Sequence, residues 1–429
     1  MASILYIRFI YSSFWFFIPN GCLIKYYRHA RIPTFWYCRS IPFPGFYGFY
    51  LRCHRFFEYC ALKALKFAGG SGIKLFLFFY TVVSCLTIVT SNDIMILTMT
   101  PFIYYSTVRA KINPVPFLIA EFFAANTWSM MLLIGNPTNM IVAESFRLEF
   151  IDYSRWMICP AMAGGIVNYI ILRWIFRKDI NKEYSLEFEE REISIFAICY
   201  FFLLGICLTC LAFASSKAQP LWKVSLAFAI FSFWIMLFSS FFTQENKIKG
   251  RISIIERLKE SGTVIALKNL IPMLRIAPFI LSLLILVEAL KEHGIIDFIA
   301  LTLFHAIDNN PLMGVLVMGF GSTFACNLFN NIPMTVTFVK ILQNPLFMGM
   351  PNIESLRYAL CMGSNLGANI TPIGALAGIM WLSILHSKGR EEIDVKEITK
   401  KFIKYGIITT ILVTLISSLV LAAEVWMGW

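Results

Sequence analysis

Short polar clusters rich in Asn, Pro and Gly interrupt four otherwise apolar stretches of this chain. An Asn side chain offers hydrogen-bond donors and acceptors, and a Pro or Gly break frees backbone amide and carbonyl groups within an apolar helix. Half-helix N-termini attract anions and polar groups, whereas half-helix C-termini and unwound carbonyls attract cations. We therefore expect the clusters to bind a small polar or ionic solute. The candidate residues are Ser91, Asn92, Asp93, Asn126, Gly135, Asn136, Pro137, Asn139, Asn330, Asn331, Pro333, Asn365, Gly367, Asn369, Thr371, Pro372 and Gly374.

Asp93 brings a carboxylate into these clusters, beside Asn92 and in the middle of an apolar stretch. A buried ionisable group is costly, so it is a functional candidate by default. Asp93 could also cap the helix that follows it. The two roles are compatible, and we favour a role in proton or ion coupling. The chain has no P-loop, GxSxG or HExxH sequence, so we predict no enzyme and no metal or cofactor.

The composition places these clusters in a membrane. Hydrophobic residues make up 58% of the chain and charged residues 14%, whereas a soluble chain carries roughly 25% charged residues. Long apolar runs, such as the one from Pro114 to Ile134, are continuous rather than alternating, which favours helices over a barrel. The net charge of +12 lies in the loops, where orientation signals belong, so we predict no nucleic-acid partner. The predicted fold is an all-α polytopic membrane protein.

The two halves of the chain resemble each other at a nearly constant offset of about 239 residues. The matches are 57–62 with 296–301, 92–95 with 330–333, Asn126 with Asn365, and 134–135 with 373–374. The distribution of Lys and Arg among the loops places the start of the first unit in the cytoplasm and the start of the second outside. This arrangement predicts two inverted-topology repeats with broken transmembrane helices. Paired interruptions at equivalent places in such repeats point to a transport site near the bilayer midplane.

Basic residues and the repeat together predict how the chain is organised. The loops at 109–113, 177–191 and 387–402 carry many Lys and Arg residues and are expected in the cytoplasm, with the C-terminus outside. The span at 271–290 should have a partner at 32–51, where Arg and Pro interrupt the sequence, so we expect a misread or degenerate start. Four tryptophans suit an interfacial belt: Trp156, Trp174, Trp381 and Trp426. The predicted segments are an atypical N-terminal segment (1–55), a first transporter repeat (56–190), scaffold helices (191–243), a cytoplasmic linker (244–270) and a second transporter repeat (271–429).

Several of these stretches resemble the ion-transporter superfamily of arsenite efflux permeases, NhaD-type sodium/proton antiporters and citrate or dicarboxylate transporters. The arsenite permease branch is the most similar, over roughly 56–429. The stretches are 57–62, 91–93, 139–142, 176–180, 330–333, 363–367, 370–374 and 381–382. The resemblance implies re-entrant helical hairpins with tips at Ser91–Asp93 and Asn330–Asn331, and unwound helices at Gly135–Asn139 and Asn369–Gly374. It also implies a homodimer, and for arsenite members proton exchange and a separate ATPase subunit.

Three functions remain open, and we favour the first. It is proton-coupled efflux of arsenite, antimonite or a similar small inorganic solute, because arsenite is largely neutral at pH 7 and needs hydrogen bonds more than fixed charge. The second is a sodium/proton antiporter or a sodium-coupled di- or tricarboxylate transporter, although no Lys or Arg lies within the breaks to hold a carboxylate. The third is a non-transporting pseudo-transporter. The expected partners are an inorganic or carboxylate solute, H⁺ or Na⁺ as coupling ion, and the lipid bilayer, with the plasma membrane favoured over an organelle membrane.

Overall fold

The structure, a computed structural model, describes residues 56–184, 195–216, 223–224, 226–232, 234–235, 277–308, 310–350, 352–388 and 394–428. The predictions for the N-terminal segment at 1–55 and for the linker at 244–270 lie outside these residues. The described residues form helices and short 3-10 turns, with one isolated bridge between Ser71 and Glu183. The all-α prediction is therefore confirmed for the described part of the chain.

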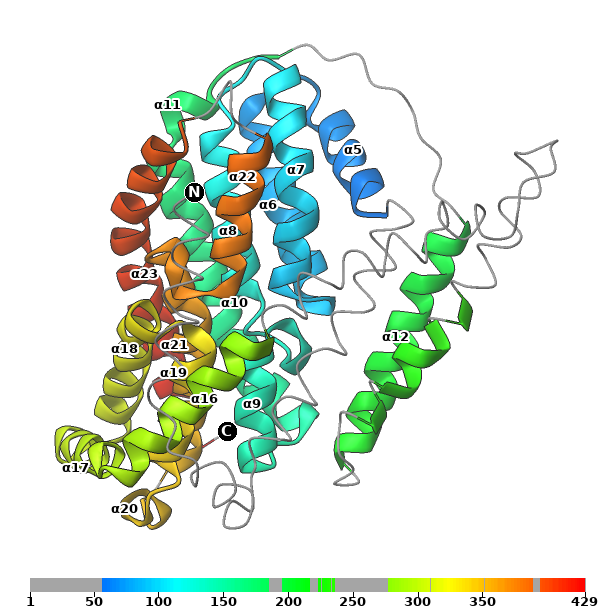
Figure 1. The fold of residues 1–429 in the computed structure, drawn as a ribbon. Coiled ribbons are helices and arrows are strands. Elements are labelled where there is room, and N and C mark those ends of the chain that lie inside the picture. Colours follow the sequence, from blue (N-terminus) through cyan, green and yellow to red (C-terminus); the bar gives the residue numbers. More distant parts are fainter. Residues whose placement is uncertain are drawn as a thin grey trace. The chain divides into compact units, whose positions relative to one another are not determined.

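The first half contains a series of helices that the polar clusters separate (Figure 1). They are α5 (Phe56–Ala68), α6 (Gly72–Val89), α7 (Asn92–Arg109), α8 (Val115–Trp128), the 3-10 turn η1 (Leu133–Gly135), α9 (Pro137–Phe146), α10 (Phe150–Ile175) and α11 (Arg177–Ile180), followed by α12 (Ile195–Ser216). Helix α8 ends at Trp128, earlier than the apolar run that continues to Ile134 suggested. The first break therefore begins at Ser129, because an apolar run does not by itself reveal where a helix unwinds.

The second half repeats this order. Its elements are α16 (Ala277–Glu292), α17 (Ile295–Ile307), α18 (Pro311–Phe329), α19 (Asn331–Leu342), α20 (Pro345–Met348), α21 (Ile353–Leu366), η2 (Gly367–Asn369), η3 (Pro372–Gly374), α22 (Leu376–Lys388) and α23 (Val395–Trp426). The boundaries recur at the offset read from the sequence. Helices α5 and α17 both start and end 239 residues apart, as do η1 and η3, and the same spacing separates the starts of α6 and α18 and of α7 and α19.

Helices of one half pack against helices of the other in matching pairs. Helix α7 contacts α22, and its counterpart α19 contacts α9, which precedes α10 as α22 precedes α23. Helices α10 and α23, the longest described helix of each half, contact each other extensively. Within each half, α6 contacts α8 and α18 contacts α21. Each break is therefore enclosed by elements from both halves.

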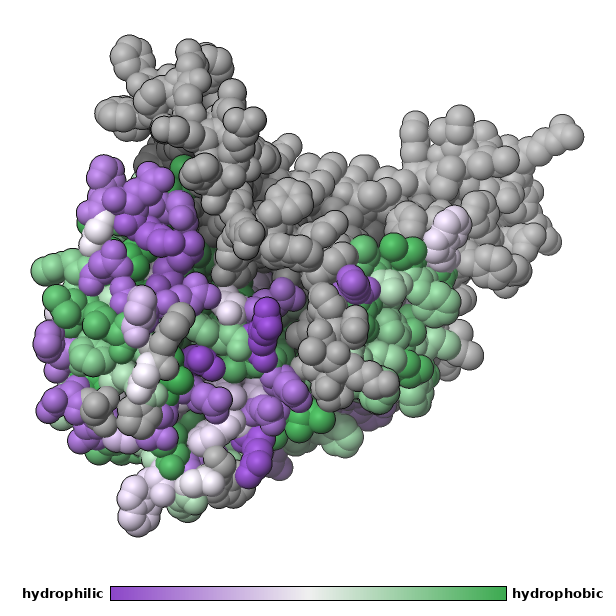
Figure 2. All heavy atoms as spheres, turned by 90° about the horizontal axis from the view of Figure 1, so that it is seen from below, coloured by the Kyte–Doolittle hydropathy of each residue, from purple (hydrophilic) through white to green (hydrophobic). Residues whose placement is uncertain are grey.

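Four described helices are long and apolar enough to cross a membrane: Gly72–Val89, Phe150–Ile175, Pro311–Phe329 and Val395–Trp426. The long helix α10 exposes Ile158, Met162, Ile166 and Ile170, which recur every four residues and so form one apolar face. Figure 2 views the molecule from below and shows hydrophilic residues gathered over one part of this surface, with hydrophobic residues beside them. An apolar helix face of this kind suits lipid. The protein is an integral, multi-pass membrane protein.

Trp381 is not part of an interfacial belt. Its side chain is 0% exposed, and its ring lies 5.6 Å from that of Phe122 on α8 and 5.4 Å from that of Phe402 on α23. The prediction that Trp381 lies in an interfacial belt is wrong, because helices α8 and α23 pack against its ring. Trp174 and Trp426 are 66% and 89% exposed, as an interfacial position requires.

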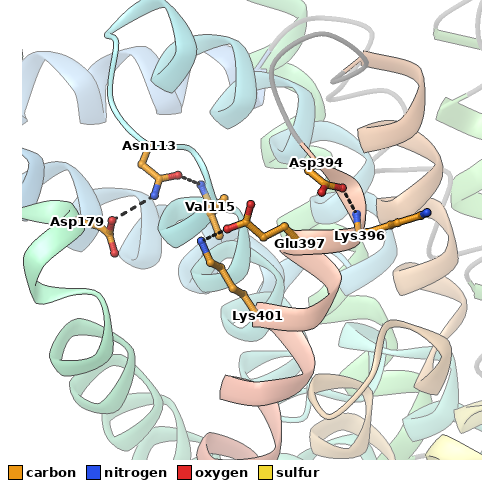
Figure 3. A network of polar contacts seen from close by, with 7 residues as sticks. All are labelled: Asn113, Val115, Asp179, Asp394, Lys396, Glu397 and Lys401. Carbon is orange, nitrogen blue, oxygen red and sulfur yellow. Dashed lines mark hydrogen bonds and ion pairs between the residues drawn. The ribbon is translucent and has the colours of Figure 1, made fainter.

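Three loops that the sequence places in the cytoplasm contribute polar residues to one region (Figure 3). Asn113, just before α8, donates from Nδ2 to Oδ1 of Asp179 on α11 at 3.2 Å. Beside them, Lys401 and Glu397 near the start of α23 form an ion pair of 2.7 Å, and Lys401 interacts electrostatically with Asp179. The N-terminal ends of α8 and α23 and the short helix α11 therefore lie near one another.

Candidate solute-binding site

Two asparagines at equivalent positions in the two halves lie at the centre of the polar clusters. Asn126 is in the last turn of α8 and Asn365 in the last turn of α21, and both side chains are 0% exposed. Each helix ends where the chain unwinds, and the final carbonyls of a helix lack intrahelical partners. Both side chains therefore lie beside backbone carbonyl groups that have no partner within their own helix.

Asn126 joins the start of α7 to the break between α21 and α22 in the second half. Its Oδ1 accepts a hydrogen bond from Nδ2 of Asn92 at 2.9 Å, and its Nδ2 donates to Oδ1 of Asn369 at 3.2 Å. Asn92 is the first residue of α7, and Asn369 is the last residue of η2. The turn between α6 and α7, the end of α8 and the break in the second half thus meet at one amide.

Asn365 joins the second half to the break between α8 and α9 in the first half. Its Oδ1 accepts from Oγ of Ser129 at 2.7 Å and from Nδ2 of Asn136 at 2.8 Å. Its Nδ2 donates to Oδ1 of Asn139 at 2.7 Å. These bonds are buried, and hydrogen bonds are electrostatically stronger in a low-dielectric interior. Oγ of Ser129 also lies 2.8 Å from the carbonyl oxygen of Asn126, so polar groups of three of the four clusters form one hydrogen-bonded network.

The fourth cluster, at the turn between α18 and α19, is only partly satisfied. Asn330 donates from Nδ2 to the carbonyl oxygen of Ile373 at 3.1 Å, and its backbone has φ 68° and ψ 154°, a region that is nearly exclusive to glycine. Asn331 is 3% exposed, and no described residue bonds its Oδ1. Its counterpart at the 239-residue offset of the helix starts is Asn92, whose Oδ1 accepts a hydrogen bond from the backbone N–H of Asp93 at 2.9 Å. A buried acceptor without a partner is costly, so Oδ1 of Asn331 is a candidate ligand-binding atom.

Asp93 lies in the first turn of α7 and is partly exposed. Its backbone N–H donates to Oδ1 of Asn92 at 2.9 Å, and no described residue bonds its carboxylate. The N-cap position belongs to Ser91, whose side chain makes no capping bond. Asp93 therefore makes no capping bond of its own, although its charge is favourably placed near a helix N-terminus.

Two glycines of the clusters are needed because backbone approaches them closely. A Cβ atom on Gly135 would lie 2.2 Å from the carbonyl oxygen of Ser129, and one on Gly367 would lie 2.5 Å from that of Thr323. Carbonyl oxygens of the main chain cannot move aside as the end of a side chain can. These glycines therefore permit the tight folding of each break.

The remaining cluster residues shape the breaks. Pro137 and Pro372 are the first residues of α9 and η3, where a missing N–H is tolerated, and Pro333 is the third residue of α19. Thr371 donates from Oγ1 to Oδ1 of Asn327 at 2.6 Å. A Cβ atom on Gly374 would lie 2.9 Å from the same oxygen.

Sequence reasoning missed several polar residues that complete the network. Oγ1 of Thr127 accepts from Nδ2 of Asn168 on α10 at 3.1 Å and from Nδ2 of Asn369 at 3.3 Å. Asn327 donates from Nδ2 to the carbonyl oxygen of Gly367 at 3.0 Å. Each is a polar residue within an apolar helix, so the available signal was an isolated Asn or Thr rather than a Pro or Gly break.

A multi-pass α-helical membrane protein whose interrupted helices enclose a buried polar network has the arrangement of a transporter. The comparison of its sequence with family models agrees. Residues 46–363 match the model described as "Citrate transporter" (CitMHS), which is well over half of the 429 residues. The chain belongs to the CitMHS transporter family.

Curated relatives include proteins with arsenical pump names. The "Arsenical pump membrane protein" of Escherichia coli (strain K12) is 25% identical over 341 residues, which cover 78% of this chain and 74% of that protein. The protein of that name from Yersinia enterocolitica is 26% identical over 343 residues, with the same coverage. A "46 kDa membrane protein" of Mycobacterium leprae (strain TN) is 25% identical over 363 residues, 82% of this chain and 79% of that protein. The resemblance to citrate transporters and arsenite permeases is thereby confirmed.

Proposed function

We propose that this protein is a secondary active transporter that exports arsenite, antimonite or a similar small inorganic solute in exchange for protons. The observation that carries the proposal is the chemistry of the site. Its asparagine amides bond one another, and each of the turns α6–α7 and α18–α19 leaves an acceptor open to a solute: the carboxylate of Asp93 and Oδ1 of Asn331. Open acceptors suit a solute that carries its own hydroxyl donors, as neutral arsenous acid does.

The absence of basic residues in the clusters favours an uncharged solute over a carboxylate. A di- or tricarboxylate should need a cationic or dipolar clamp, and Arg or Lys in a bidentate contact provides the stronger one. Lys340, on α19, has its ammonium group 2.9 Å from Oε2 of Glu288 and is thus already neutralised. Citrate is a second candidate solute because the matching family model is described as a citrate transporter.

Two inverted repeats with re-entrant hairpins are the architecture we propose around this site. The hairpins are α6–α7, with its tip at Ser91–Asp93, and α18–α19, with its tip at Asn330–Asn331. The recurring element boundaries and the matched packing of α7 on α22 and of α19 on α9 support a two-fold relation between the halves. Half-helix N-termini at α7, α19 and α9 would then converge on the solute, and proton coupling would involve Asp93. A homodimer and a separate ATPase remain expectations from the resemblance.

Resistance to arsenite in an efflux-deficient cell tests this function. Cells expressing the wild type should survive arsenite and antimonite, and Asp93→Asn or Asn331→Ala should remove the protection at equal protein levels. The matched control is Asp152→Asn, an exposed carboxylate in the first turn of α10 outside the site. An unprotected wild type that instead moves citrate or sodium in vesicles would replace this proposal with the carboxylate or sodium alternative.

A further inference from the structure

A carboxyl group lies enclosed in the middle of α8, apart from the asparagine network. Glu121 is the seventh residue of this 14-residue helix, and its side chain is 1% exposed. Oγ1 of Thr100, on α7, lies 2.9 Å from Oε1 of Glu121 and 3.1 Å from Oε2. A hydroxyl has one proton to donate and lone pairs to accept. It therefore satisfies both oxygens best when one of them carries a proton and donates it back to Oγ1.

No described residue neutralises a charge on Glu121. Thr100 is its polar partner among the described residues. Helices α6, α7, α10 and α21 pack against α8, and α22 and α23 contact it through the rings of Trp381 and Phe402. The charged residues and histidines whose side chains the structure describes on these helices lie in the first or last three turns, whereas Glu121 lies at mid-helix. They are Lys74, Asp93, Arg109, Asp152, Arg155, Arg173, Glu354, Arg357, His386, Lys396, Glu397, Lys400, Lys401, Lys404 and Glu424. An unpaired carboxylate in such a place is expensive, so this conformation favours the neutral acid.

The second half shows that packing alone does not require this pair. At the offset that relates Asn126 to Asn365, Glu121 corresponds to Leu360 and Thr100 to Val339. Both are 0% exposed, and α19 contacts α21 as α7 contacts α8. The equivalent helix pair carries Leu and Val at these positions in one half and Glu and Thr in the other. Packing of these helices therefore does not require the polar pair.

We propose that Glu121 is a proton-binding group of the transport cycle, separate from Asp93, which takes up and releases the proton exchanged for solute. In the present conformation the acid is closed off by Thr100. When α7 moves relative to α8, Thr100 separates from it and water reaches the carboxyl. Its O–H bond then breaks, the proton passes to water, and the carboxylate remains until a proton returns from the opposite side. This role rests on the proposed function, in which protons drive transport.

Two variants separate proton coupling from folding. Glu121→Gln keeps the shape and a hydrogen bond to Thr100 but cannot release a proton. The double variant Glu121→Leu with Thr100→Val reproduces the pair present in the second half. In proteoliposomes, both should still exchange labelled arsenite across the membrane without a pH gradient. Accumulation driven by a pH gradient should fall at least tenfold, and exchange should lose its pH dependence.

Asp152→Asn should behave as the wild type in both assays. The proposal is overturned if Glu121→Gln accumulates arsenite as the wild type does, with the same pH profile. It is also overturned if folded Glu121→Gln loses exchange and accumulation together, or if the substitution changes the dependence on Na⁺ instead of that on pH.

An infrared titration tests the protonation of Glu121 independently of the proposed transport function. A wild type that transports none of arsenite, antimonite, citrate or sodium contradicts the function, but the protonation of Glu121 can still be measured in the purified protein. A carbonyl band of a protonated carboxylic acid should be present and should disappear in Glu121→Gln. An identical band in both proteins would refute a protonated Glu121.

Discussion

Removing the Asn365 side chain should strongly destabilise the contact between the two halves. Asn365→Ala deletes its bonds to Ser129, Asn136 and Asn139. Interhelical hydrogen bonds in membrane proteins contribute about 0.6 kcal/mol each on average and about 1.7 at most, so three of them give about 2–5 kcal/mol. The cost of leaving the buried amides of Asn136 and Asn139 unpaired, about 1–3 kcal/mol each, leads to a similar range. This is a large part of a typical free energy of unfolding.

The measurement is unfolding in mixed detergent micelles, followed by the reactivity of buried cysteines such as Cys326 and Cys361. The control is Asn310→Ala, which removes an exposed N-cap of α18 that accepts from the backbone amides of Leu312 and Met313 and should cost about 1 kcal/mol. If Asn365→Ala destabilises the protein no more than this control, the network does not hold the halves together and the reasoning fails.

Two further predictions concern other contacts. Gly135→Ala should reduce transport at least tenfold, because its Cβ would lie 2.2 Å from the carbonyl oxygen of Ser129, whereas Gly205→Ala, whose Cβ meets nothing within 4 Å, should have no effect; equal transport by both variants would show that the break tolerates a side chain. Lys340→Gln should lower the free energy of unfolding by about 1–3 kcal/mol by leaving the half-buried Glu288 without its cation. Adding Glu288→Gln should recover most of that loss, and a double variant as unstable as the single one would mean that the ion pair is not the cause.

Some features of the site are the same in both halves, whereas others occur in one half alone. Asn126 and Asn365 occupy equivalent positions, as the repeat requires, and each bonds an asparagine of the opposite half. Asn331 and Glu121 depart from it, since one has an open acceptor where its counterpart is paired and the other is a carboxyl where its counterpart is Leu360. An ionisable or open polar group that only one half carries cannot be explained by the packing that the halves share. The departures are therefore the better guide to chemistry.

The sequence alone determined the class of protein, the offset of the halves and the approximate positions of the breaks, although it did not show that α8 already unwinds at Ser129. These are local properties: continuous apolar runs predict membrane helices, and Asn, Pro and Gly interrupt them wherever they occur. Only the tertiary structure decided which polar groups pair, because Asn365 bonds residues more than 220 positions away in the chain. It also enclosed Trp381 and Glu121, which a sequence shows only as residues on a helix. Burial and hydrogen bonding between distant segments depend on how the two halves pack, and no local pattern encodes that.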